Sequence, residues 1–508
     1  MTDDLEDGKF GRRALLEWVA ASAALAGCAR APVRKIVPYV AQPPEVQPGR
    51  PLHYATAWEI DGYGMGLVVR SNTGRPTKIE GNPKHPASLG ATRAVDQALV
   101  EMLWDPDRED HLRDAGGPVA LAEFQQRLAK KRVAILMEPT SSRSVEGLVA
   151  RVRREMPGSD VWFHSAMPRA NVWRAAELAT GAVVEPVLDF SGARVLVAFA
   201  SDFLASGHDC VRNGRGLADR RATKDGARLY SVESRRTATG AFADERFAAT
   251  GRVRARVACA IAAEILGKSA SPAARGLADR LRTRAAGAGG AWAAACARDL
   301  EKAPRGTAAW IVGDDEPAGL HALAWLVNGA LGSIGTVVRP VPSSVLEAGQ
   351  PSHDLDAFVS RLARGDVDVA VICGTNPLYS TPNGALAAAL PRAKETVYVG
   401  LRQNETSRAC RWFVPLAHPL ESWGDVRAYD GTASIVQPLI APLYGGKSAH
   451  DVLAAMSDRP EQSGHDIVRA HWSPRGGASF DASWRKWLHD GVIGGTAFAP
   501  RPVTVKPD

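Results

Sequence analysis

The sequence has few of the residues that build metal clusters. Only six cysteines occur among its 508 residues, and no two of them form a C-x-x-C pair. Iron–sulfur clusters and structural zinc sites use closely spaced thiolates, so the sequence predicts neither kind of site. Isolated cysteines in this pattern are expected to be small buried hydrophobic residues, not a disulfide framework. They are Cys28, Cys210, Cys259, Cys296, Cys373 and Cys410.

An excess of charge of one sign is also lacking. Lys and Arg number 62 against 55 Asp and Glu, for a net charge of +7, and no aromatic-interleaved basic stripe occurs. This argues against a nucleic-acid partner. The 12 histidines include no H-E-x-x-H pair, and the sequence has no G-x-S-x-G nucleophile elbow. The hydrophobic share of 45% is ordinary for a globular protein, and the length predicts two to four domains.

A short apolar run near the N-terminus indicates export. The run at 18–27 follows Arg12 and Arg13. A helix of that length rises about 15 Å, whereas a bilayer core is about 30 Å thick, so the run is too short to span it. A charged start, a short apolar stretch and small residues are typical of a signal peptide. The paired arginines favour the twin-arginine route.

Leu25-Ala26-Gly27-Cys28 ends this run and resembles a bacterial lipobox. Cleavage would leave Cys28 as an acylated N-terminus, and several acyl chains hold a protein at a membrane far better than one. The alternative is a small-residue helix that happens to contain a cysteine. We expect a signal peptide over 1–28, a proline-rich tether over 29–50, and a protein anchored at the periplasmic face of a bacterial membrane.

The rest of the chain alternates between apolar strand patterns and alanine-rich helical patterns. This alternation predicts an α/β protein with parallel sheets. The predicted strands lie at 133–137, 195–199, 229–232, 309–312, 369–372 and 396–399. The clearest helical patterns lie at 120–128, 145–156 and 257–266. Before them, 72–75 reads Asn-Thr-Gly-Arg after a strand-like run and predicts a β-hairpin.

Several segments together resemble the molybdopterin oxidoreductases. The series begins with 74–83, continues with His85-Pro86 and Gly90, and ends with 104–108, in the order of that family's N-terminal domain. Later, Gly374, Thr375, Asn376 and Pro377 directly follow a predicted strand, and 405–431 resembles the segment that crosses back under the cofactor. In this family the loop at 374–377 contacts the guanine-dinucleotide end of the pterin. Judged from its sequence alone, such a turn is more often a plain turn than a site.

One branch of the family matches best. The segments 35–40, 86–92 and 421–431 look typical of the B subunit of alternative complex III, a quinol-oxidising respiratory complex. The resemblance implies iron–sulfur, multihaem cytochrome and integral membrane quinol-oxidising subunits as partners. That subunit usually continues into a region with cysteine clusters. Either a separate polypeptide supplies such a region here, or the sequence is incomplete.

The residues that serve catalysis in the family are missing. The stretch 54–67, where cluster cysteines usually lie, has none, and the later cysteine position falls near Ala91. The window for a metal ligand, 163–172, offers only Ser165 beside His164. Arg169 and Arg402 are the candidates for binding an anionic cofactor. We therefore predict no iron–sulfur cluster and no metal in this chain, with Gly374 to Pro377 as a vestigial cofactor loop.

The expected architecture is an α/β, molybdopterin-oxidoreductase-like fold with a small mixed N-terminal domain and two Rossmann-like domains, one inserted in the other. The expected function is a non-catalytic scaffold subunit of a quinol:electron-acceptor oxidoreductase. One alternative is a reductase of a sulfur or nitrogen oxyanion that binds molybdopterin guanine dinucleotide. Another is a periplasmic ligand-binding lipoprotein. The expected domain boundaries are 51–110 for the small domain, 111–155 with 306–455 for the first Rossmann-like domain, 156–305 for the second, and 456–508 for a tail packing on the first.

Overall fold

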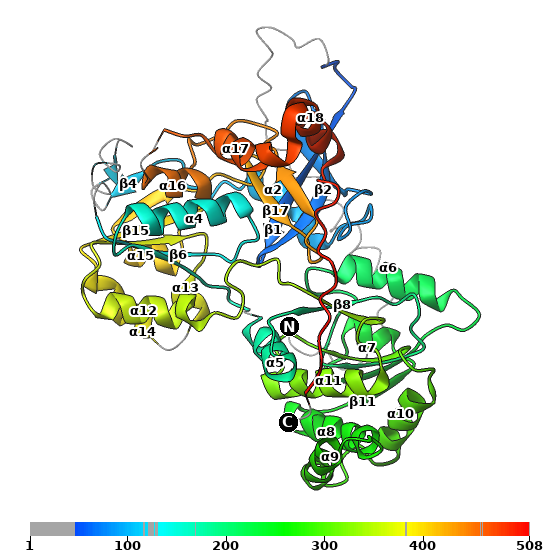
Figure 1. The fold of residues 1–508 in the computed structure, drawn as a ribbon. Coiled ribbons are helices and arrows are strands. Elements are labelled where there is room, and N and C mark those ends of the chain that lie inside the picture. Colours follow the sequence, from blue (N-terminus) through cyan, green and yellow to red (C-terminus); the bar gives the residue numbers. More distant parts are fainter. Residues whose placement is uncertain are drawn as a thin grey trace, which may run out of the picture. The chain divides into compact units, whose positions relative to one another are not determined.

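The structure is a computed structural model that describes residues 46–114, 117–119, 126, 131–167, 169–381, 384–457, 459 and 461–506. Arg12, Arg13 and Cys28 lie outside the described residues, as does nearly all of the helical pattern predicted at 120–128. Residues 48–508 form one unit, to which the following description applies (Figure 1). No helix in the described part of the chain is both long and apolar enough to cross a membrane.

Three antiparallel strands open the fold: β1 (Leu52–Ile60), β2 (Tyr63–Asn72) and β3 (Arg75–Gly81). The predicted hairpin is present, since Asn72 pairs with Arg75 across a turn in which Thr73 and Gly74 both have positive φ. Helix α2 (Ala94–Leu103) contacts β3, and Leu99 and Leu103 of this helix are fully buried in one core cluster with residues of the strands. This hairpin sheet supplies one wall of the cavity described below.

A seven-stranded sheet carries five of its strands in parallel, in the order β5-β4-β16-β15-β14-β6-β7. Its parallel strands are almost wholly apolar because helices cover both faces. Val145, Leu148 and Val152 of one helix pack on one face, and Phe358 and Leu362 of another pack on the opposite face. The elements are β4 (Arg113–Asp114), β5 (Gly117–Pro118), β6 (Val133–Met137), α4 (Arg143–Glu155), β7 (Asp160–Phe163), α12 (Leu355–Ala363), β14 (Val369–Cys373), α14 (Ala385–Ala389), β15 (Glu395–Gly400) and β16 (Trp412–Pro415).

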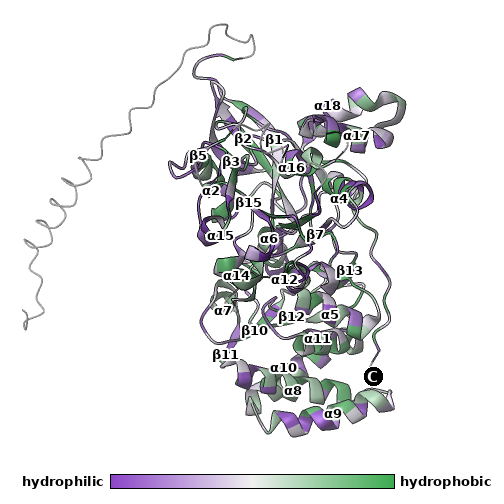
Figure 2. Cartoon of the chain, turned by 90° about the vertical axis from the view of Figure 1, so that its left-hand side faces the viewer, coloured by the Kyte–Doolittle hydropathy of each residue, from purple (hydrophilic) through white to green (hydrophobic). Residues whose placement is uncertain are grey.

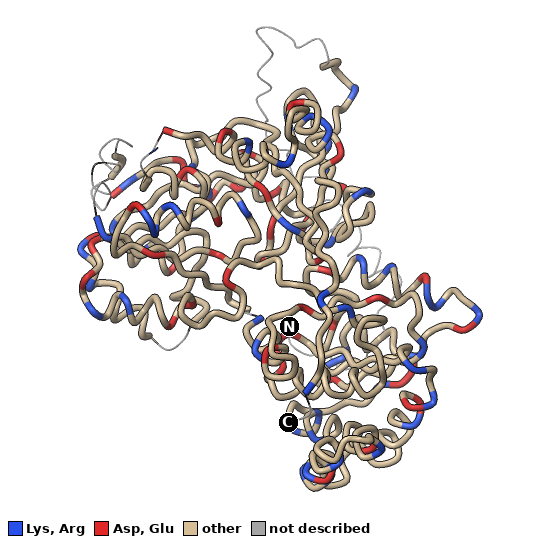
Figure 3. The backbone as a smooth tube through the Cα atoms, viewed as in Figure 1, with Lys and Arg blue, Asp and Glu red and all other residues tan. Residues whose placement is uncertain are grey.

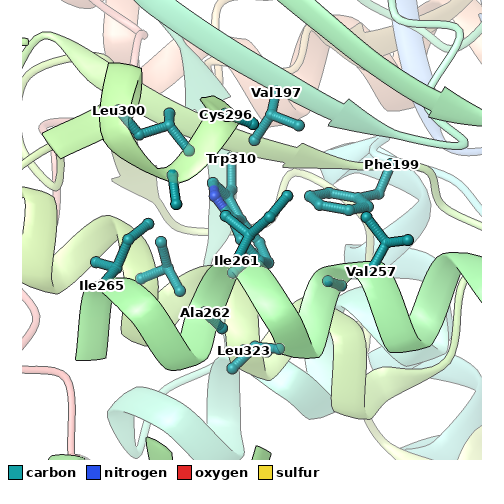
Figure 4. Packing of buried hydrophobic residues seen from close by; sticks show 14 of the residues in the cluster. Val197, Phe199, Val257, Ile261, Ala262, Ile265, Cys296, Leu300, Trp310 and Leu323 are labelled. Atoms are coloured by element: carbon teal, nitrogen blue, oxygen red, sulfur yellow. The ribbon is translucent and has the colours of Figure 1, made fainter. Parts of the chain in front are cut away.

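A second parallel sheet has four strands in the order β11-β10-β9-β12. Trp310 of the edge strand β12 is 2% exposed and lies among apolar side chains of the strands and of helices α8, α10 and α11, which cover this face (Figure 4). Leu217 of α6 packs on the other face. The elements are α5 (Ala170–Thr180), β8 (Glu185–Leu188), β9 (Val195–Phe199), α6 (Cys210–Arg221), β10 (Arg228–Glu233), α7 (Ala238–Phe242), β11 (Glu245–Ala248), α8 (Gly251–Gly267), α9 (Pro272–Ala285), α10 (Gly290–Lys302), β12 (Ala308–Val312), α11 (Ala318–Leu331) and β13 (Val338–Val341).

All six predicted strands are present, but two predicted domain boundaries are wrong. Strand β7, placed in the second Rossmann-like domain by a boundary at 156, pairs with β6 in the seven-stranded sheet. Strand β12, placed in the first domain by a boundary at 306, pairs with β9 in the four-stranded sheet. Both strands were assigned to the wrong sheet for the same reason. The buried parallel strands of both sheets are short apolar runs, and the sequence of such a run does not indicate which sheet the strand joins.

The C-terminal part is built around tryptophans. The i, i+3 spacing of Trp484 and Trp487 predicts that these two residues, together with Trp472, anchor this part of the chain. Trp472 and Trp484, 4% and 5% exposed, pack with Trp487 over the hairpin of β17 and β18. The helices that carry the three tryptophans, α17 and α18, lie side by side (Figure 2). The end of this tail also packs outside the first domain, because Val503 and Val505 lie against α5 and α11. The remaining elements are η1 (Pro351–His353), α13 (Pro377–Ser380), η2 (Leu390–Arg392), α15 (Glu405–Ala409), β17 (Gly424–Arg427), β18 (Ala433–Val436), α16 (Ala449–Ala455), α17 (Gly464–Gly476), η3 (Gly477–Ser479) and α18 (Phe480–Asp490).

Candidate functional site

A cavity of about 900 Å³ lies at the carboxyl ends of the four-stranded sheet. Its floor is formed by the segments that follow three parallel strands: 200–203 after β9, 233–235 at the end of β10, and 313–316 after β12. Ligands of open α/β sheets bind at this edge. Tyr63 of β2 and Arg169, next to α5, line the cavity from other parts of the fold. Position and volume make this cavity the candidate site.

Glu185 is the hub of a buried polar network in the cavity wall. Its side chain is only 4% exposed. Its carboxylate accepts hydrogen bonds from Tyr63 Oη (2.6 Å), Trp173 Nε1 (2.7 Å), Ser343 Oγ (2.8 Å) and Arg169 Nη2 (2.9 Å). Arg169 also donates from Nη1 to Asp314 at 2.5 Å. The network therefore joins the first hairpin, α5, β8 and the loop after β12.

Glu185 is negatively charged at neutral pH, because its surroundings favour the carboxylate. Burial by itself would raise the pKa of Glu185. The Arg169 guanidinium, followed by smaller contributions from His208 and two of the hydrogen bonds, outweighs burial and lowers the pKa to about 2. The His208 ring stacks on Tyr63 with 3.7 Å between centroids, and burial lowers the pKa of His208. At neutral pH the hub is thus a carboxylate whose charge is compensated by Arg169.

The lining of the cavity is acidic. Eight carboxylates face four guanidinium groups there, whereas both signs are interspersed along the chain as a whole (Figure 3). Three of the four guanidinium groups pair with carboxylates of the chain itself: Arg169 with Glu185, Arg93 with Asp96 at 2.7 Å, and Arg254 with Glu316. The pterin dinucleotide of the molybdopterin oxidoreductases is a polyanion and would need free positive groups or backbone N–H groups. This donor set does not fit it.

The predicted cofactor loop is held by the chain itself. Asn376 Oδ1 accepts from the backbone N (3.2 Å) and Oγ1 (2.7 Å) of Thr406, and Asn376 Nδ2 donates to Glu405 at 2.8 Å. Gly374 has φ +80°, and a Cβ added to it would lie 3.1 Å from the carboxyl group of Glu138. The side chain of Glu138 therefore lies directly against this turn of the loop. The loop ends β14 and ties it to α15.

Replacing Asn376 by alanine should lower the free energy of unfolding by about 1–3 kcal/mol, because it leaves the fully buried Thr406 without its acceptor. Urea unfolding measures the change. Tyr379→Ala, at a side chain 75% exposed one helical turn away, is the control and should change stability by less than about 0.5 kcal/mol. Equal effects of both variants would contradict a structural role for the Asn376 hydrogen bonds.

The candidate ligands predicted from the sequence are occupied by contacts within the chain. Ser165, 8% exposed, donates to Asp61 at 2.8 Å, and His164 Nε2 lies 2.9 Å from Ser380 Oγ. Arg402, predicted as a candidate for binding an anionic cofactor, instead pairs with Asp105 at 2.9 Å and is exposed. Residues 54–67, where a cluster loop would lie, are strand and turn of the first hairpin. Among the described residues, no group of three or more His, Cys, Asp or Glu is arranged to hold a metal ion.

Two sets of polar residues that lie close together in the sequence are the other candidates for a catalytic group: Ser201, Asp202 and His208, and the pair Glu59 and Asp61. Ser201, Asp202 and His208 line the cavity together, but no hydrogen bond joins Ser201 to His208 in the described part of the chain. Asp202 instead accepts from the backbone N of Thr239 at 2.9 Å. Glu59 accepts from Thr140 and from Ser141, so it stabilises the turn after β6. Neither grouping forms a nucleophile–base pair.

The sequence indicates Arg169 as a site residue, but it indicates neither Glu185 nor the other partners of Glu185. The signal available was a lone acidic residue in the apolar run 183–188, Val-Val-Glu-Pro-Val-Leu. A carboxylate in such a run must find donors or remain costly to bury. Its donors could not be named, because Tyr63 lies 122 positions and Ser343 158 positions away along the chain.

Comparisons with known proteins show what this chain is similar to. No family model matches the sequence. The chain is 24% identical over 493 residues to the menaquinone reductase, molybdopterin-binding-like subunit, of Nitratidesulfovibrio vulgaris (strain Hildenborough), covering 86% of this chain and 69% of that protein. Acetylene hydratase from Pelobacter acetylenicus, a molybdopterin-family enzyme, matches in structure with a TM-score of 0.62 and 13% identity, over 88% of this chain and 73% of that chain. The chain therefore has the molybdopterin-oxidoreductase-type fold that its sequence motifs predict, and over most of its length it is similar to the molybdopterin-binding-like subunit of menaquinone reductase.

Proposed function

We propose that this protein is a non-catalytic subunit of a membrane-bound respiratory quinone oxidoreductase of the alternative complex III type. The relative in Nitratidesulfovibrio vulgaris is named as a molybdopterin-binding-like subunit of menaquinone reductase, which supports a place in a respiratory complex. The segments at 35–40, 86–92 and 421–431 support the alternative complex III branch. In this role the chain holds iron–sulfur, multihaem cytochrome and integral membrane subunits together.

The observation that carries the proposal is the character of the cavity. Its carboxylates outnumber its guanidinium groups by eight to four, and three of those four guanidinium groups are paired within the chain. A reductase would require a metal ligand and a bound anionic pterin. Ser165, the best ligand by position, donates to Asp61 instead. The fold does not need a cofactor for its stability, because its sheets are covered by buried apolar side chains, each contributing about 1.5–3 kcal/mol.

The test is purification of the protein at its native level from membranes dissolved in mild detergent. We expect multihaem and iron–sulfur proteins to co-purify in fixed ratio with this chain, together with an integral membrane subunit. A matched purification from a strain lacking this gene serves as the control for non-specific capture. Recovery of this chain as a clean monomer under the same conditions would contradict the proposed role.

We also propose that the protein is exported by the twin-arginine route and anchored through Cys28. The motifs Arg12-Arg13 and Leu25-Ala26-Gly27-Cys28 support both steps. The anchor would place the chain at the periplasmic face of the membrane that carries its partners.

Replacing Cys28 by alanine should release the protein from membranes that have been washed to remove peripheral proteins, because the acyl chains are lost with the thiol. Fractionation and immunodetection measure the release, and mass spectrometry of the wild type should find an acylated Cys28. Ser22→Ala, within the same apolar run, is the control and should remain in the membrane fraction. An unmodified N-terminus at another residue would refute the anchor.

A further inference from the structure

Three carboxylates at the carboxyl edge of the four-stranded sheet line the cavity and form no ion pair among the described residues. Asp202 follows β9, Asp315 follows β12, and Asp209 precedes α6, so all three lie at the carboxyl edge of the four-stranded sheet. Within the described part of the chain, none of the three forms an ion pair, unlike Glu185, Asp314 and Glu316 of the same lining. Clustered carboxylates repel one another unless positive charge lies between them.

His321 is a second and independent feature of this cavity. It lines the cavity from α11 and is 6% exposed. Burial lowers the pKa of His321 to about 4, so its ring is neutral at pH 7. Backbone hydrogen bonds with Gly313 and Asp314 raise that pKa, as carbonyl acceptors do, and Nε2 has no partner among the described residues. In a neutral ring whose other nitrogen donates, Nε2 is an acceptor that lacks a donor.

Asn213 adds one unused donor. The side chain is 1% exposed, lines the same cavity from α6, and its Nδ2 has no hydrogen-bond partner among the described residues. An amide N–H in this position requires an acceptor such as a hydroxyl or carbonyl oxygen. Leaving buried polar groups unpaired is costly, so His321 and Asn213 together indicate a ligand that donates a hydrogen bond to one of them and accepts one from the other.

We propose that the cavity binds a small organic ammonium compound that also carries hydroxyl groups, of the amino-alcohol or amino-sugar class. An ammonium group supplies the positive charge and three donors for Asp202, Asp209 and Asp315. A hydroxyl of the same molecule accepts from Asn213 and can donate to His321. The volume of about 900 Å³ lies within the range of small-molecule sites, about 300–1,000 Å³, and Phe203 and Val312 give the lining apolar surface. This site goes beyond the proposed role in a complex and does not depend on it.

Titration calorimetry with glucamine and with sorbitol on the detergent-solubilised full chain tests the site. The two compounds share a carbon skeleton and differ in one ammonium group against one hydroxyl. We expect saturable binding of glucamine, weakened by added salt, and at least about tenfold weaker binding of sorbitol. Absence of saturable glucamine binding, or equal affinity for sorbitol, would overturn the proposal. Tighter binding of inorganic pyrophosphate than of glucamine would also overturn it, because the cavity would then be an anion site.

Two substitutions locate the binding. Asp315→Asn changes an exposed side chain of the cavity rim and should weaken glucamine binding about tenfold or more without lowering the unfolding temperature. Asp279→Asn removes the same charge from the exposed face of α9, outside the cavity, and should leave the affinity unchanged. Equal loss in both variants would show that the attraction is only that of the net surface charge, and the proposed site would be wrong.

Discussion

Replacing Arg108 by alanine should lower the free energy of unfolding by about 3–5 kcal/mol. Arg108 donates to the Glu421 carboxylate from Nη1 (3.0 Å) and Nη2 (2.7 Å), and the two side chains are 3% and 0% exposed. The carboxylate also accepts from the backbone N of His418 and Leu443. Without Arg108, the buried Glu421 carboxylate keeps its backbone hydrogen bonds but loses its counter-charge. Urea unfolding followed by circular dichroism measures the loss.

The control for Arg108 is an ion pair of the same chemistry at the surface. Arg402 pairs with Asp105 at 2.9 Å, but its side chain is 59% exposed. Solvent screens such a pair, so Arg402→Ala should cost less than about 1 kcal/mol. If Arg108→Ala costs no more than Arg402→Ala, the account of a buried pair joining the N-terminal part of the fold to the segment before β17 is wrong.

The second large effect concerns Glu185 and acid. Its pKa is about 2 in the folded protein, against an ordinary value of 4.5. The unfolded chain therefore binds more protons between these values, and the stability due to this group is complete above about pH 4.5 and is lost as pH falls towards 2. The loss is on the order of 3 kcal/mol. The charges of Arg169 and His208 act on Glu185, and those of Tyr63, Asp314 and Asp209 act on its partner Arg169.

Glu185→Gln should remove this acid-dependent part and should also destabilise the protein at neutral pH, because the buried Arg169 keeps only Asp314 as a partner. The measurement is the free energy of unfolding against pH for the wild type and the variant. Glu177→Gln, an exposed position on α5, removes the same charge and should leave the pH profile unchanged. A Glu185→Gln profile parallel to that of the wild type below pH 4.5 would contradict a lowered pKa for Glu185.

Local patterns of the sequence predicted much of the fold. The apolar run 369–372 forms most of β14, and the helical pattern at 257–266 forms part of α8. A strand buried on both faces is a continuous apolar run, and a helix buried along one face has apolar residues at helical spacing, so both patterns can be recognised within a short segment. Trp484 and Trp487 packed as anchors because their spacing places them on one side of α18. The arrangement into a small N-terminal domain and two Rossmann-like domains was predicted from the resemblance to the family, not from these local patterns.

The pairing of strands and the site were harder to predict. Nothing in β7 or β12 states which sheet it joins, so the boundaries at 156 and 306 were wrong. The Glu185 network depends on contacts between residues more than a hundred positions apart, which only the folded chain brings together. The sequence did indicate Ser165 as the candidate metal ligand. The residues around Ser165 in the sequence do not indicate that its hydroxyl donates to Asp61.

The most direct test of the central claim is the molybdenum, tungsten and pterin content of the purified protein. The protein should be isolated from its native membranes and separated from its partner subunits, with a catalytic molybdopterin enzyme from the same cells as the positive control. We expect well under one molybdenum or tungsten atom per chain and no released pterin, because the acidic cavity and the self-paired arginines do not suit an anionic dinucleotide. Near-stoichiometric metal together with a released pterin would contradict the account and identify the protein as a reductase.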